Sequence, residues 1–260
     1  MNNHVIGINT FIKTQDTLRL INSLNNCIGV DKYKLCISID STNYMAYENK
    51  PEWVDKNIEL RNQLIELSQS NKFNFKSIEL IILETNRGPY GSCKTIIDHS
   101  MKYSDYVIFL EDDCIVSYDF LLYHEYMEQN FAYKDPKAYA IASSLMYWPK
   151  NYSFGLGKID KVYKANWVPS FEFGITDKIW QTFGEHRGKF PEGDIYFGQA
   201  CRDNNMYSFY PMIPRCYRDV YQKDSYSAYY APEKNIEEKI PVLSENKNNI
   251  TYQYSELIYE

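Results

Sequence analysis

Three consecutive carboxylates, Glu111, Asp112 and Asp113, follow the apolar run 106–110. Adjacent like charges repel one another and lose hydration when buried, so either the strand has reached solvent here or a positive group lies beside it. On extended backbone, side chains i and i+2 point the same way, which predicts that Glu111 and Asp113 lie together and Asp112 opposite. Two carboxylates at this spacing suit a hard divalent cation, Mn²⁺ or Mg²⁺, which completes its shell with phosphate and water. A solvated strand end explains the acids equally well.

A second group of residues favours a phosphate ligand. The Gly- and Pro-containing stretch 86–91 includes Arg87 and leads into a predicted helix over 90–102, which carries Lys94. The backbone N–H groups at the start of a helix, together with a basic residue, favour a bound phosphate. Neither the Walker pattern G-x-x-x-x-G-K-[ST] nor the dinucleotide pattern G-x-G-x-x-G is present. We therefore expect a nucleoside diphosphate held by a metal ion and a few basic groups.

The elements that must position these residues alternate along the first half of the chain. Apolar and β-branched runs predict strands, and apolar residues at helical spacing predict helices between them. The strands are expected over 5–9, 35–40, 77–83 and 106–110, and the helices over 17–28, 52–70 and 90–102. This alternation predicts an α/β fold with a mostly parallel sheet flanked by helices. Ligands of such sheets bind beyond the carboxyl ends of the strands, where Asp40 and the three acids are expected.

The second half of the chain is less regular and is expected on the acceptor side. Strands are predicted over 139–144, 171–175 and 207–213, and helices over 118–131, 176–183 and 194–205. We predict one domain over 1–230, with a nucleotide-binding half (1–131) and an acceptor half (132–230). The polar and charged segment 231–260 is interpreted as a C-terminal extension, a lid or an arm toward a partner, and the sequence does not choose among these.

Composition narrows the class of protein and its expected location. The net charge of −6, without a long basic run, argues against a nucleic-acid-binding protein. The first residues lack the pattern of a secretory signal, and no stretch approaches the roughly 20 apolar residues of a membrane span. The six cysteines are scattered, so we expect reduced and mostly buried thiols. We expect a cytoplasmic protein and leave open a peripheral position at the inner face of the membrane.

Four segments in order carry a resemblance to a known family: Ile-Asn-Thr-Phe-Ile-Lys, Ile-Ser-Ile-Asp, Asn-Arg-Gly and Phe-Leu-Glu-Asp-Asp-Cys-Ile-Val-Ser-Tyr-Asp-Phe. The chain resembles the GT-A-fold nucleotide-sugar glycosyltransferases with a D-x-D-type metal motif. It is most similar to the N-acetylglucosaminyltransferase I type and its bacterial, family-2-like relatives. The resemblance extends from residue 4 to residue 230 and is strongest over 84–131.

The resemblance implies a role for each residue that matches the family's donor-binding positions. Asp113 would bind Mn²⁺ or Mg²⁺ directly, and Glu111 and Asp112 would hold the ribose, the sugar or metal-bound water. Thr10 and Phe11 would line the nucleobase pocket, and Asp40 would bond the base. Arg87 and Lys94 would lie near the diphosphate.

An inverting member of this family also needs a general base on the acceptor side. The matching stretch is 190–197, in which Asp194 is the predicted base and Glu192 the reserve. An Asp before a helix is also a common N-cap, which explains the residue without catalysis.

The chain departs from the family after the last predicted strand. Tyr229 stands where relatives carry a metal-binding His, and the accompanying glycines are missing, so a third protein ligand for the metal is left open. Arg215, Arg218 and Lys223 could pair with the diphosphate instead, or could belong to an ordinary surface loop.

Together these features predict a metal-dependent inverting glycosyltransferase that moves a sugar from a UDP-sugar to a glycan hydroxyl. The resemblance places it in bacterial surface-polysaccharide synthesis, of capsule or lipooligosaccharide, with lipid-linked glycans among the acceptors and a homo-oligomer among the states considered. One alternative is a sugar-1-phosphate nucleotidyltransferase, which would need a Gly/Arg-rich loop that residues 9–13 lack. Another is a non-enzymatic glycan-binding protein that uses the acids as a calcium site.

Overall fold

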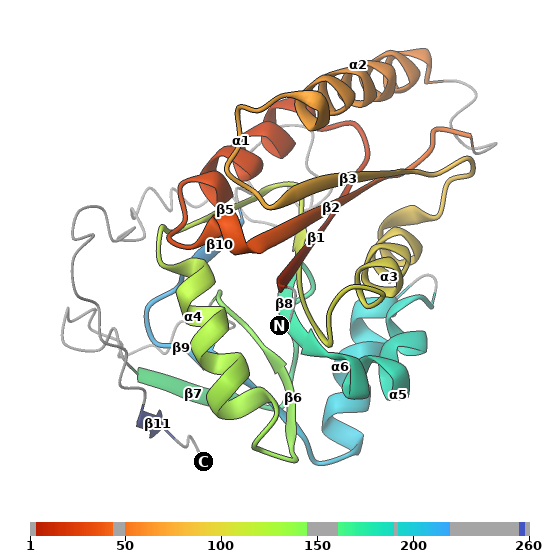
Figure 1. Cartoon of the computed structure of the whole chain (residues 1–260). Helices are drawn as coiled ribbons and strands as arrows, with labels where there is room; N and C mark the ends of the chain where they lie inside the picture. The colour runs from red at the N-terminus through yellow and green to blue at the C-terminus, as the bar shows by residue number, and fades with distance from the viewer. Residues whose placement is uncertain (1–3, 44–49, 145–160, 190–191, 219–254, 258–260) are drawn as a thin grey trace, which may run out of the picture.

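The described chain is an α/β structure built on one large sheet. A computed structural model describes residues 4–43, 50–144, 161–189, 192–218 and 255–257. Within these residues the large sheet has the strand order β11-β7-β9-β6-β8-β4-β1-β2-β3, and β5 and β10 form a separate two-stranded sheet (Figure 1). The predicted α/β class, with a mostly parallel sheet flanked by helices, is confirmed.

The first half of the sheet is parallel, and its strands have the apolar runs that the sequence predicts. β1 lies between β2 and β4, and β2 pairs on its other side with β3. The strands are β1 (His4–Thr10), β2 (Tyr33–Ile39), β3 (Ser77–Ile82) and β4 (Tyr106–Glu111). The helices that connect them are α1 (Thr14–Asn25), α2 (Pro51–Gln69) and α3 (Gly88–Ser100).

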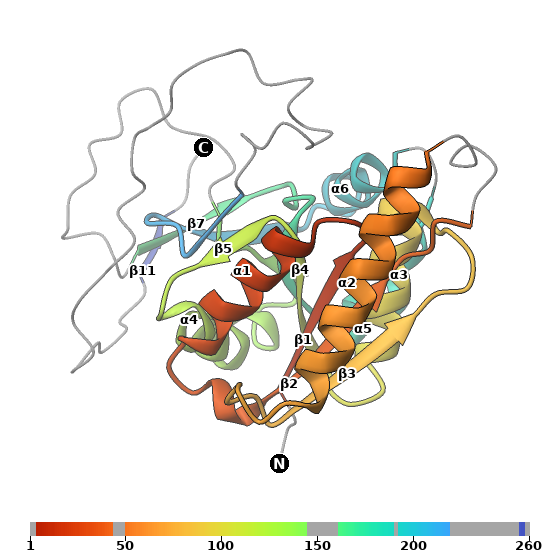
Figure 2. The same cartoon turned by 90° about the horizontal axis from the view of Figure 1, so that it is seen from above.

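Helices cover both faces of this sheet, because neighbouring residues of a buried strand point to opposite sides. Ile6 and Ile8 of β1 pack into one core with α1 and α2, while Val5 packs into a second core with α3. Seen from above, α1 and α2 lie over the sheet, with α3 behind them (Figure 2). The sheet is therefore buried on both faces, and its carboxyl edge is left for ligands.

The second half adds antiparallel strands and more helices. β8 pairs antiparallel with both β4 and β6 and so joins the two halves of the sheet. The strands here are β5 (Cys114–Val116), β6 (Ala138–Ile141), β7 (Lys161–Ala165), β8 (Glu172–Thr176), β9 (Tyr207–Pro211), β10 (Cys216–Arg218) and β11 (Ser255–Leu257). The helices are α4 (Phe120–Met127), followed by a π-helical turn over 128–132, α5 (Asp177–Arg187) and α6 (Gly193–Asp203).

The predicted strands and helices are present with shifted ends, and four short strands were not predicted. β5, β7, β10 and β11 are three to five residues long, too short for a period to show in the sequence. β11 belongs to the predicted extension 231–260 and pairs with β7. The rest of that extension lies outside the described residues, so its division from the domain stays a prediction.

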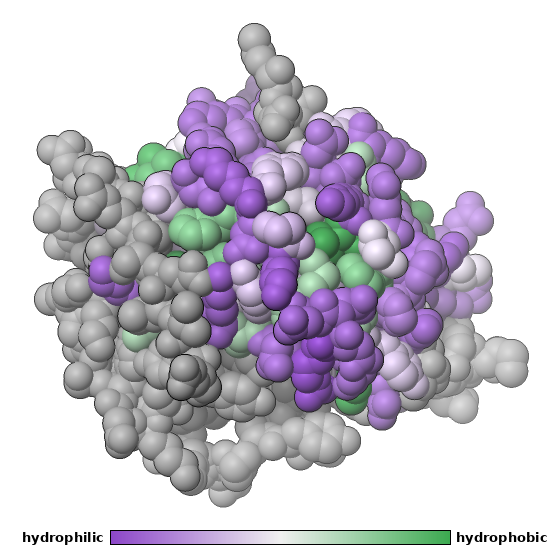
Figure 3. Space-filling model, turned by 90° about the horizontal axis from the view of Figure 1, so that it is seen from below, coloured by the Kyte–Doolittle hydropathy of each residue, from purple (hydrophilic) through white to green (hydrophobic). Residues whose placement is uncertain are grey.

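Two further expectations concern cysteines and membranes. All six cysteines are free and buried, which confirms the predicted burial. Among the described helices, none is both long enough and apolar enough to cross a bilayer. Seen from below Figure 1, the described residues are mostly hydrophilic, with small hydrophobic areas between the polar side chains (Figure 3). Scattered apolar side chains of this kind are normal on a protein surface.

Candidate active site

The candidate site lies where β2, β1 and β4 end side by side. Thr10 of β1 is in register with Ile39 of β2, and Asn9 is in register with Glu111 of β4. Residues that follow these strands therefore meet at one edge of the sheet. This is the position that the alternation of strands and helices predicts for a ligand.

Glu111, Asp112 and Asp113, named here the acidic turn, connect β4 to β5. Glu111 ends β4, and Asp112 and Asp113 form a turn before β5 begins at Cys114. The prediction of extended backbone through all three residues is therefore wrong, because the chain turns at Asp112 and Asp113 before β5, which pairs with β10. Glu111 and Asp113 nonetheless share one partner, Arg218, while Asp112 accepts a hydrogen bond from Thr10.

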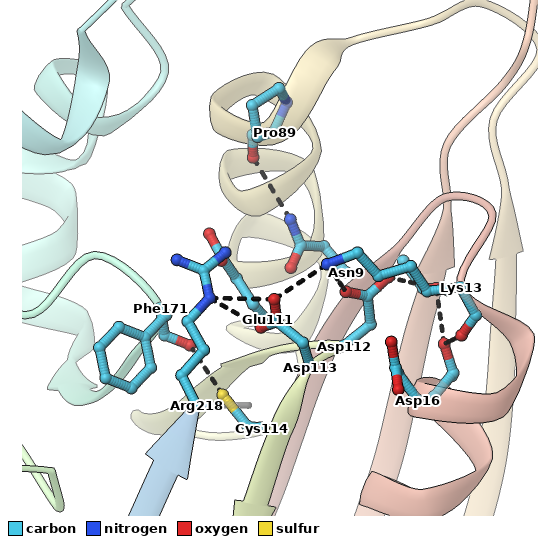
Figure 4. Close-up of polar contacts among 12 residues, drawn as sticks. Asn9, Lys13, Asp16, Pro89, Glu111, Asp112, Asp113, Cys114, Phe171 and Arg218 are labelled. Atoms are coloured by element: carbon cyan, nitrogen blue, oxygen red, sulfur yellow. Dashed lines mark hydrogen bonds and ion pairs between the residues drawn. The ribbon is translucent and has the colours of Figure 1, made fainter. Parts of the chain in front are cut away.

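Positive side chains surround the acidic turn and offset the repulsion among its three carboxylates. Arg218 Nε lies 3.0 Å from each oxygen of Asp113, and its Nη2 lies 2.9 Å from Glu111 Oε2. Lys13 Nζ lies 2.9 Å from Asp113 Oδ2 and 3.7 Å from Asp112 Oδ1. Figure 4 shows Arg218 and Lys13 on opposite sides of Asp113. The acids are thus paired rather than solvated.

Burial and pairing oppose each other in setting the pKa values here. Burial raises the pKa of Asp112 to about 7 against the opposing charge of Lys13, and Asp113 adds to the rise. Burial also raises the pKa of Glu111, which Arg218 opposes. Burial alone would lower the pKa of Lys13, but Asp112 and Asp113 raise it above its ordinary value. Lys13 therefore stays charged beside the acids.

Asp40 ties the end of β2 to the loop before α3. Its carboxylate accepts hydrogen bonds from the backbone N–H groups of Ser41 and Arg87, both at 2.9 Å. Burial raises the pKa of Asp40, and these N–H donors oppose the rise. The predicted base-binding acid is thus held at the same edge as the acidic turn, with its orientation fixed by the loop.

Asn57 of α2 joins the loops that follow β1 and β2, and sequence reasoning missed it. Its Nδ2 donates to the carbonyl oxygens of Phe11, at 2.6 Å, and of Asp40, at 2.9 Å. Phe11 also contacts Trp53 edge to face, with ring centroids 5.8 Å apart. Asn57 shares the buried face of α2 with Leu60, Leu64 and Leu67. A polar residue at such an apolar position was the signal that could have found it.

The two predicted phosphate-binding cations, Arg87 and Lys94, are placed differently. Arg87 lies at the edge of the sheet with an exposed side chain, and its backbone holds Asp40. The ammonium of Lys94 instead lies 2.7 Å from Asp98 and 3.0 Å from Glu185. The structure therefore brings Arg87, but not the charge of Lys94, into the contacts of the candidate site, and both roles stay predictions.

Asp194 connects to the acidic turn through two residues that sequence reasoning missed, Tyr90 and Arg187. Tyr90 lies near Asp194, and burial together with the charge of Asp194 raises the pKa of Tyr90 to about 12. Arg187 Cζ lies 5.1 Å from the centroid of the Tyr90 ring, and Arg187 Nη2 lies 3.9 Å from Glu111 Oε1. These contacts run from the predicted base to the predicted donor site.

The start of α6 does not use Asp194 as its N-cap. The helix begins at Gly193, so Asp194 lies in the first turn and accepts a hydrogen bond from the N–H of Ile195 at 3.0 Å. Glu192 occupies the cap position, is exposed and makes no capping hydrogen bond through its side chain. A Cβ on Gly193 would lie 2.1 Å from the Arg187 carbonyl oxygen, so glycine lets α6 start close to the end of α5.

Three cations were considered from the sequence as partners of the diphosphate, and only one of them lies at the candidate site in the described part of the chain. Arg218 contacts the acidic turn. Arg215 is fully buried and pairs with Asp119 at 3.0 Å, so it is a structural residue rather than a phosphate ligand. Lys223 and Tyr229 lie outside the described residues.

No protein-family model matches the sequence, and no curated protein matches it. The mannosyltransferase PcManGT from Pyrobaculum calidifontis, solved with GDP-Man and Mn²⁺, superposes with a TM-score of 0.55 at 13% identity, over 88% of this chain and 59% of that chain. S. aureus TarS 1–349 gives a TM-score of 0.52 at 12% identity, over 81% of this chain and 60% of that chain.

The complex of TarS 1–349 with UDP-GlcNAc gives a TM-score of 0.50 at 14% identity, over 81% of this chain and 58% of that chain. The chain thus spans about three fifths of the length of these structures. At such low identity the likeness concerns the fold alone. The chain has the GT-A-like fold of these structures.

Proposed function

We propose that the chain is a metal-dependent inverting glycosyltransferase that uses a nucleotide-diphosphate sugar. The observation that carries this proposal is the acidic turn at the carboxyl end of β4, beside Thr10 and Asp40 at the same edge of the sheet. The likeness to a mannosyltransferase solved with GDP-Man and Mn²⁺, and to a protein solved with UDP-GlcNAc, supports it. The finer likeness to the N-acetylglucosaminyltransferase I type is part of the proposal.

The donor would lie across the ends of β1, β2 and β4. Phe11, with Trp53 against its ring, would offer the nucleobase an apolar surface, and Asp40 would accept a hydrogen bond from it. Arg87 and the N-terminus of α3 would face the diphosphate. In this arrangement Asn57 keeps the two loops of the base pocket together.

The acidic turn has the donor set that a divalent metal ion prefers. Three carboxylates at one turn are hard oxygen ligands suited to Mn²⁺ or Mg²⁺, with Asp113 as the direct ligand and Glu111 and Asp112 beside it. Both oxygens of Asp113 accept hydrogen bonds from Arg218, so the residues fit a metal once this contact is exchanged. The bound ion would neutralise charge on the departing diphosphate.

Asp194 would take the proton from the acceptor hydroxyl, with Glu192 as the reserve. Asp194 lies in the first turn of α6, where the helix dipole favours an ionised carboxylate. Tyr90 lies near Asp194 and under Arg187. Arg187 in turn lies 3.9 Å from Glu111, so these residues would connect the base to the donor site. A base on the acceptor side of the sugar gives attack from the face opposite the diphosphate, and hence inversion.

The resemblance in the sequence supports the remaining parts of the proposal. The donor would be a UDP-sugar and the acceptor a glycan hydroxyl, including lipid-linked glycans. The reaction would belong to bacterial surface-polysaccharide synthesis, at the cytoplasmic side of the membrane.

The proposal is tested by nucleotide binding with and without metal. UDP at a hundred times its Kd should stabilise the protein by about 2.7 kcal/mol when Mn²⁺ is present, and a thermal melt measures this stabilisation. The variant Asp113→Asn should lose the part of the stabilisation that depends on Mn²⁺ and keep its fold. A screen of nucleotide sugars for donor hydrolysis then identifies the sugar. Glycan binding with no response to any nucleotide would contradict the proposal and favour a glycan-binding protein.

A further inference from the structure

The acidic turn is balanced by cations of the same chain. Glu111, Asp112 and Asp113 face three cationic side chains, those of Lys13, Arg187 and Arg218, so the formal charges cancel when all six groups are ionised. A divalent cation that entered alone would leave two uncompensated positive charges in a largely buried cluster, which is costly. A metal ion that enters with a diphosphate carrying two negative charges adds no net charge.

The three cations are not held equally. The side chain of Arg187 is 1% exposed, donates to the Ser170 carbonyl oxygen at 2.7 Å and stacks over Tyr90. The side chain of Arg218 is 24% exposed and lies over the Phe171 ring, with its Cζ 5.8 Å from the ring centroid. Arg187 is thus fixed within the protein, whereas a long and partly exposed side chain such as Arg218 can turn without moving the backbone.

Arg218 also occupies the oxygens that a metal ion would need. Its Nε contacts both oxygens of Asp113, and its Nη2 contacts Glu111, whereas Lys13 contacts a single oxygen of Asp113. A guanidinium group that leaves a carboxylate needs another anion with planar, two-pronged geometry, and a phosphate group offers it.

We propose that Arg218 is an exchangeable counter-ion of the acidic turn. It holds Asp113 and Glu111 when the donor is absent, and it transfers to the diphosphate when the metal ion takes Asp113. This inference rests on the proposed function and deepens it, because it assigns a binding residue for the donor and links the uptake of metal to the uptake of nucleotide. No bond is made or broken in this exchange, and the net charge of the cluster does not change.

The test compares metal binding and nucleotide binding in Arg218→Gln. The wild-type protein should bind Mn²⁺ weakly alone, and UDP should tighten Mn²⁺ binding by the same factor by which Mn²⁺ tightens UDP binding. Arg218→Gln should bind Mn²⁺ alone about tenfold more tightly, because Asp113 has lost a competing partner, and UDP with Mn²⁺ about tenfold more weakly. Free Mn²⁺ measured by electron paramagnetic resonance and calorimetry of UDP provide the two values.

Two further variants make the result specific. Arg202→Gln changes an exposed arginine of α6 that contacts Gln199 and Trp167, and it should alter neither affinity. Arg218→Lys keeps the charge but not the two-pronged contact, so its affinities should fall between those of the wild type and Arg218→Gln.

Several outcomes would overturn the inference. Unchanged or weaker binding of Mn²⁺ alone in a folded Arg218→Gln would show that Arg218 does not compete for Asp113, as would undetectable Mn²⁺ binding in both proteins. Tighter Mn²⁺ with unchanged UDP binding would remove the diphosphate from the proposal. Failure of the proposed function is a separate result, in which the wild type binds no nucleotide in any condition.

Discussion

The small sheet of β5 and β10 carries an acid–arginine contact at each end, and the two contacts differ in kind. At one end Asp119 and Arg215 pair at 3.0 Å, with both side chains 0% exposed. At the other end Arg218 pairs with Asp113 and Glu111 and is 24% exposed. The register of Cys216 with Val116 and of Arg218 with Cys114 places the two contacts only a few residues apart.

The comparison indicates what distinguishes a structural ion pair from an exchangeable one: how deeply the arginine is buried and how many backbone and side-chain groups hold the pair. Arg215 also donates to the Ile213 carbonyl oxygen at 2.9 Å, and Asp119 accepts a hydrogen bond from Ser117, so no group of the pair is free to leave. At the acidic turn, Lys13 and Arg218 are each shared between two carboxylates, and both of these cations are partly exposed. One end anchors β10, and the other end presents Arg218 to the candidate site.

The largest expected effect is on stability, at the anchored end. Arg215→Met should lower the free energy of unfolding by about 3–5 kcal/mol, because it leaves the Asp119 carboxylate buried without its partner. Urea unfolding followed by circular dichroism measures this loss. The matched variant Arg218→Met should cost less, since Arg218 is itself 24% exposed and Asp113 keeps Lys13 as a partner. Equal losses of unfolding free energy in the two variants would contradict the distinction between a structural Arg215 and an exchangeable Arg218.

The next effect is on the rate of transfer. Asp194→Asn should lower the rate by about 10²–10⁴-fold, because it removes the proposed general base. The unfolding free energy should change by less than about 1 kcal/mol, since Asn can still accept a hydrogen bond near a helix start. Steady-state kinetics, and proton NMR of the product for an inverted anomeric centre, provide the readout.

Three results would count against Asp194 as the base. A retained anomeric configuration would remove the need for a base at this position. A joint loss of stability and rate would make Asp194 a structural residue of α6. Glu192→Gln is the matched control, and a larger loss of rate in this variant would transfer the role to Glu192.

The smallest expected effect is on the pH dependence of the unfolding free energy. It comes from Glu172, which holds the backbone that contacts Arg215. Glu172 is fully buried and accepts hydrogen bonds from the N–H groups of Ser143 and Ser144, while the Ser143 carbonyl oxygen accepts from the N–H of Arg215 at 2.7 Å. Burial raises the pKa of Glu172 to about 7 against these donors. The folded state then binds the proton more tightly than the unfolded state, whose carboxyl has its ordinary pKa of about 4.3.

The stabilisation from this proton is therefore complete below about pH 4 and is lost as the pH rises through about 7. We expect this group to lower the unfolding free energy on the order of 2 kcal/mol between pH 5 and pH 8. Urea titrations of Glu172→Gln at the two values should show a smaller pH dependence than the wild type. Glu128→Gln removes another buried carboxyl whose pKa is raised to about 7, so it should also reduce the pH dependence, and the two variants together assign a part of the slope to each group. An unchanged slope in Glu172→Gln would exclude Glu172 as its cause.

The fold could be predicted well where a single period dominates the sequence. β1, β2 and β4 are buried on both faces and have continuous apolar runs, and α1 and α3 carry clear apolar faces. The short strands β5 and β10 could not be found in this way, because three residues do not define a period. That pair of strands brings Arg218 to the acidic turn, so the contact of Arg218 and the turn at Asp112 were both missed.

The candidate site could be predicted where it follows strand ends, and not where it depends on contacts between distant segments. Asp40 follows β2 and Asp113 follows β4, the two parallel strands that flank β1, so their position at one edge of the sheet follows from the order of elements. Arg187 meets Tyr90 and Glu111 only because α5 packs against α3. No local pattern in the sequence signals such a contact, because it depends on how the layers pack.

The central place of β1 has a consequence for the making of the protein. β1 (His4–Thr10) is synthesised before one of its two neighbours, β4, which follows about 100 residues later in the chain, with Val5 in register with Val107. At translation rates of 5–20 residues per second, one edge of this apolar strand stays without its partner for roughly 5–20 s. An unpaired apolar edge can pair with other chains. Added chaperones should therefore raise the yield of folded protein.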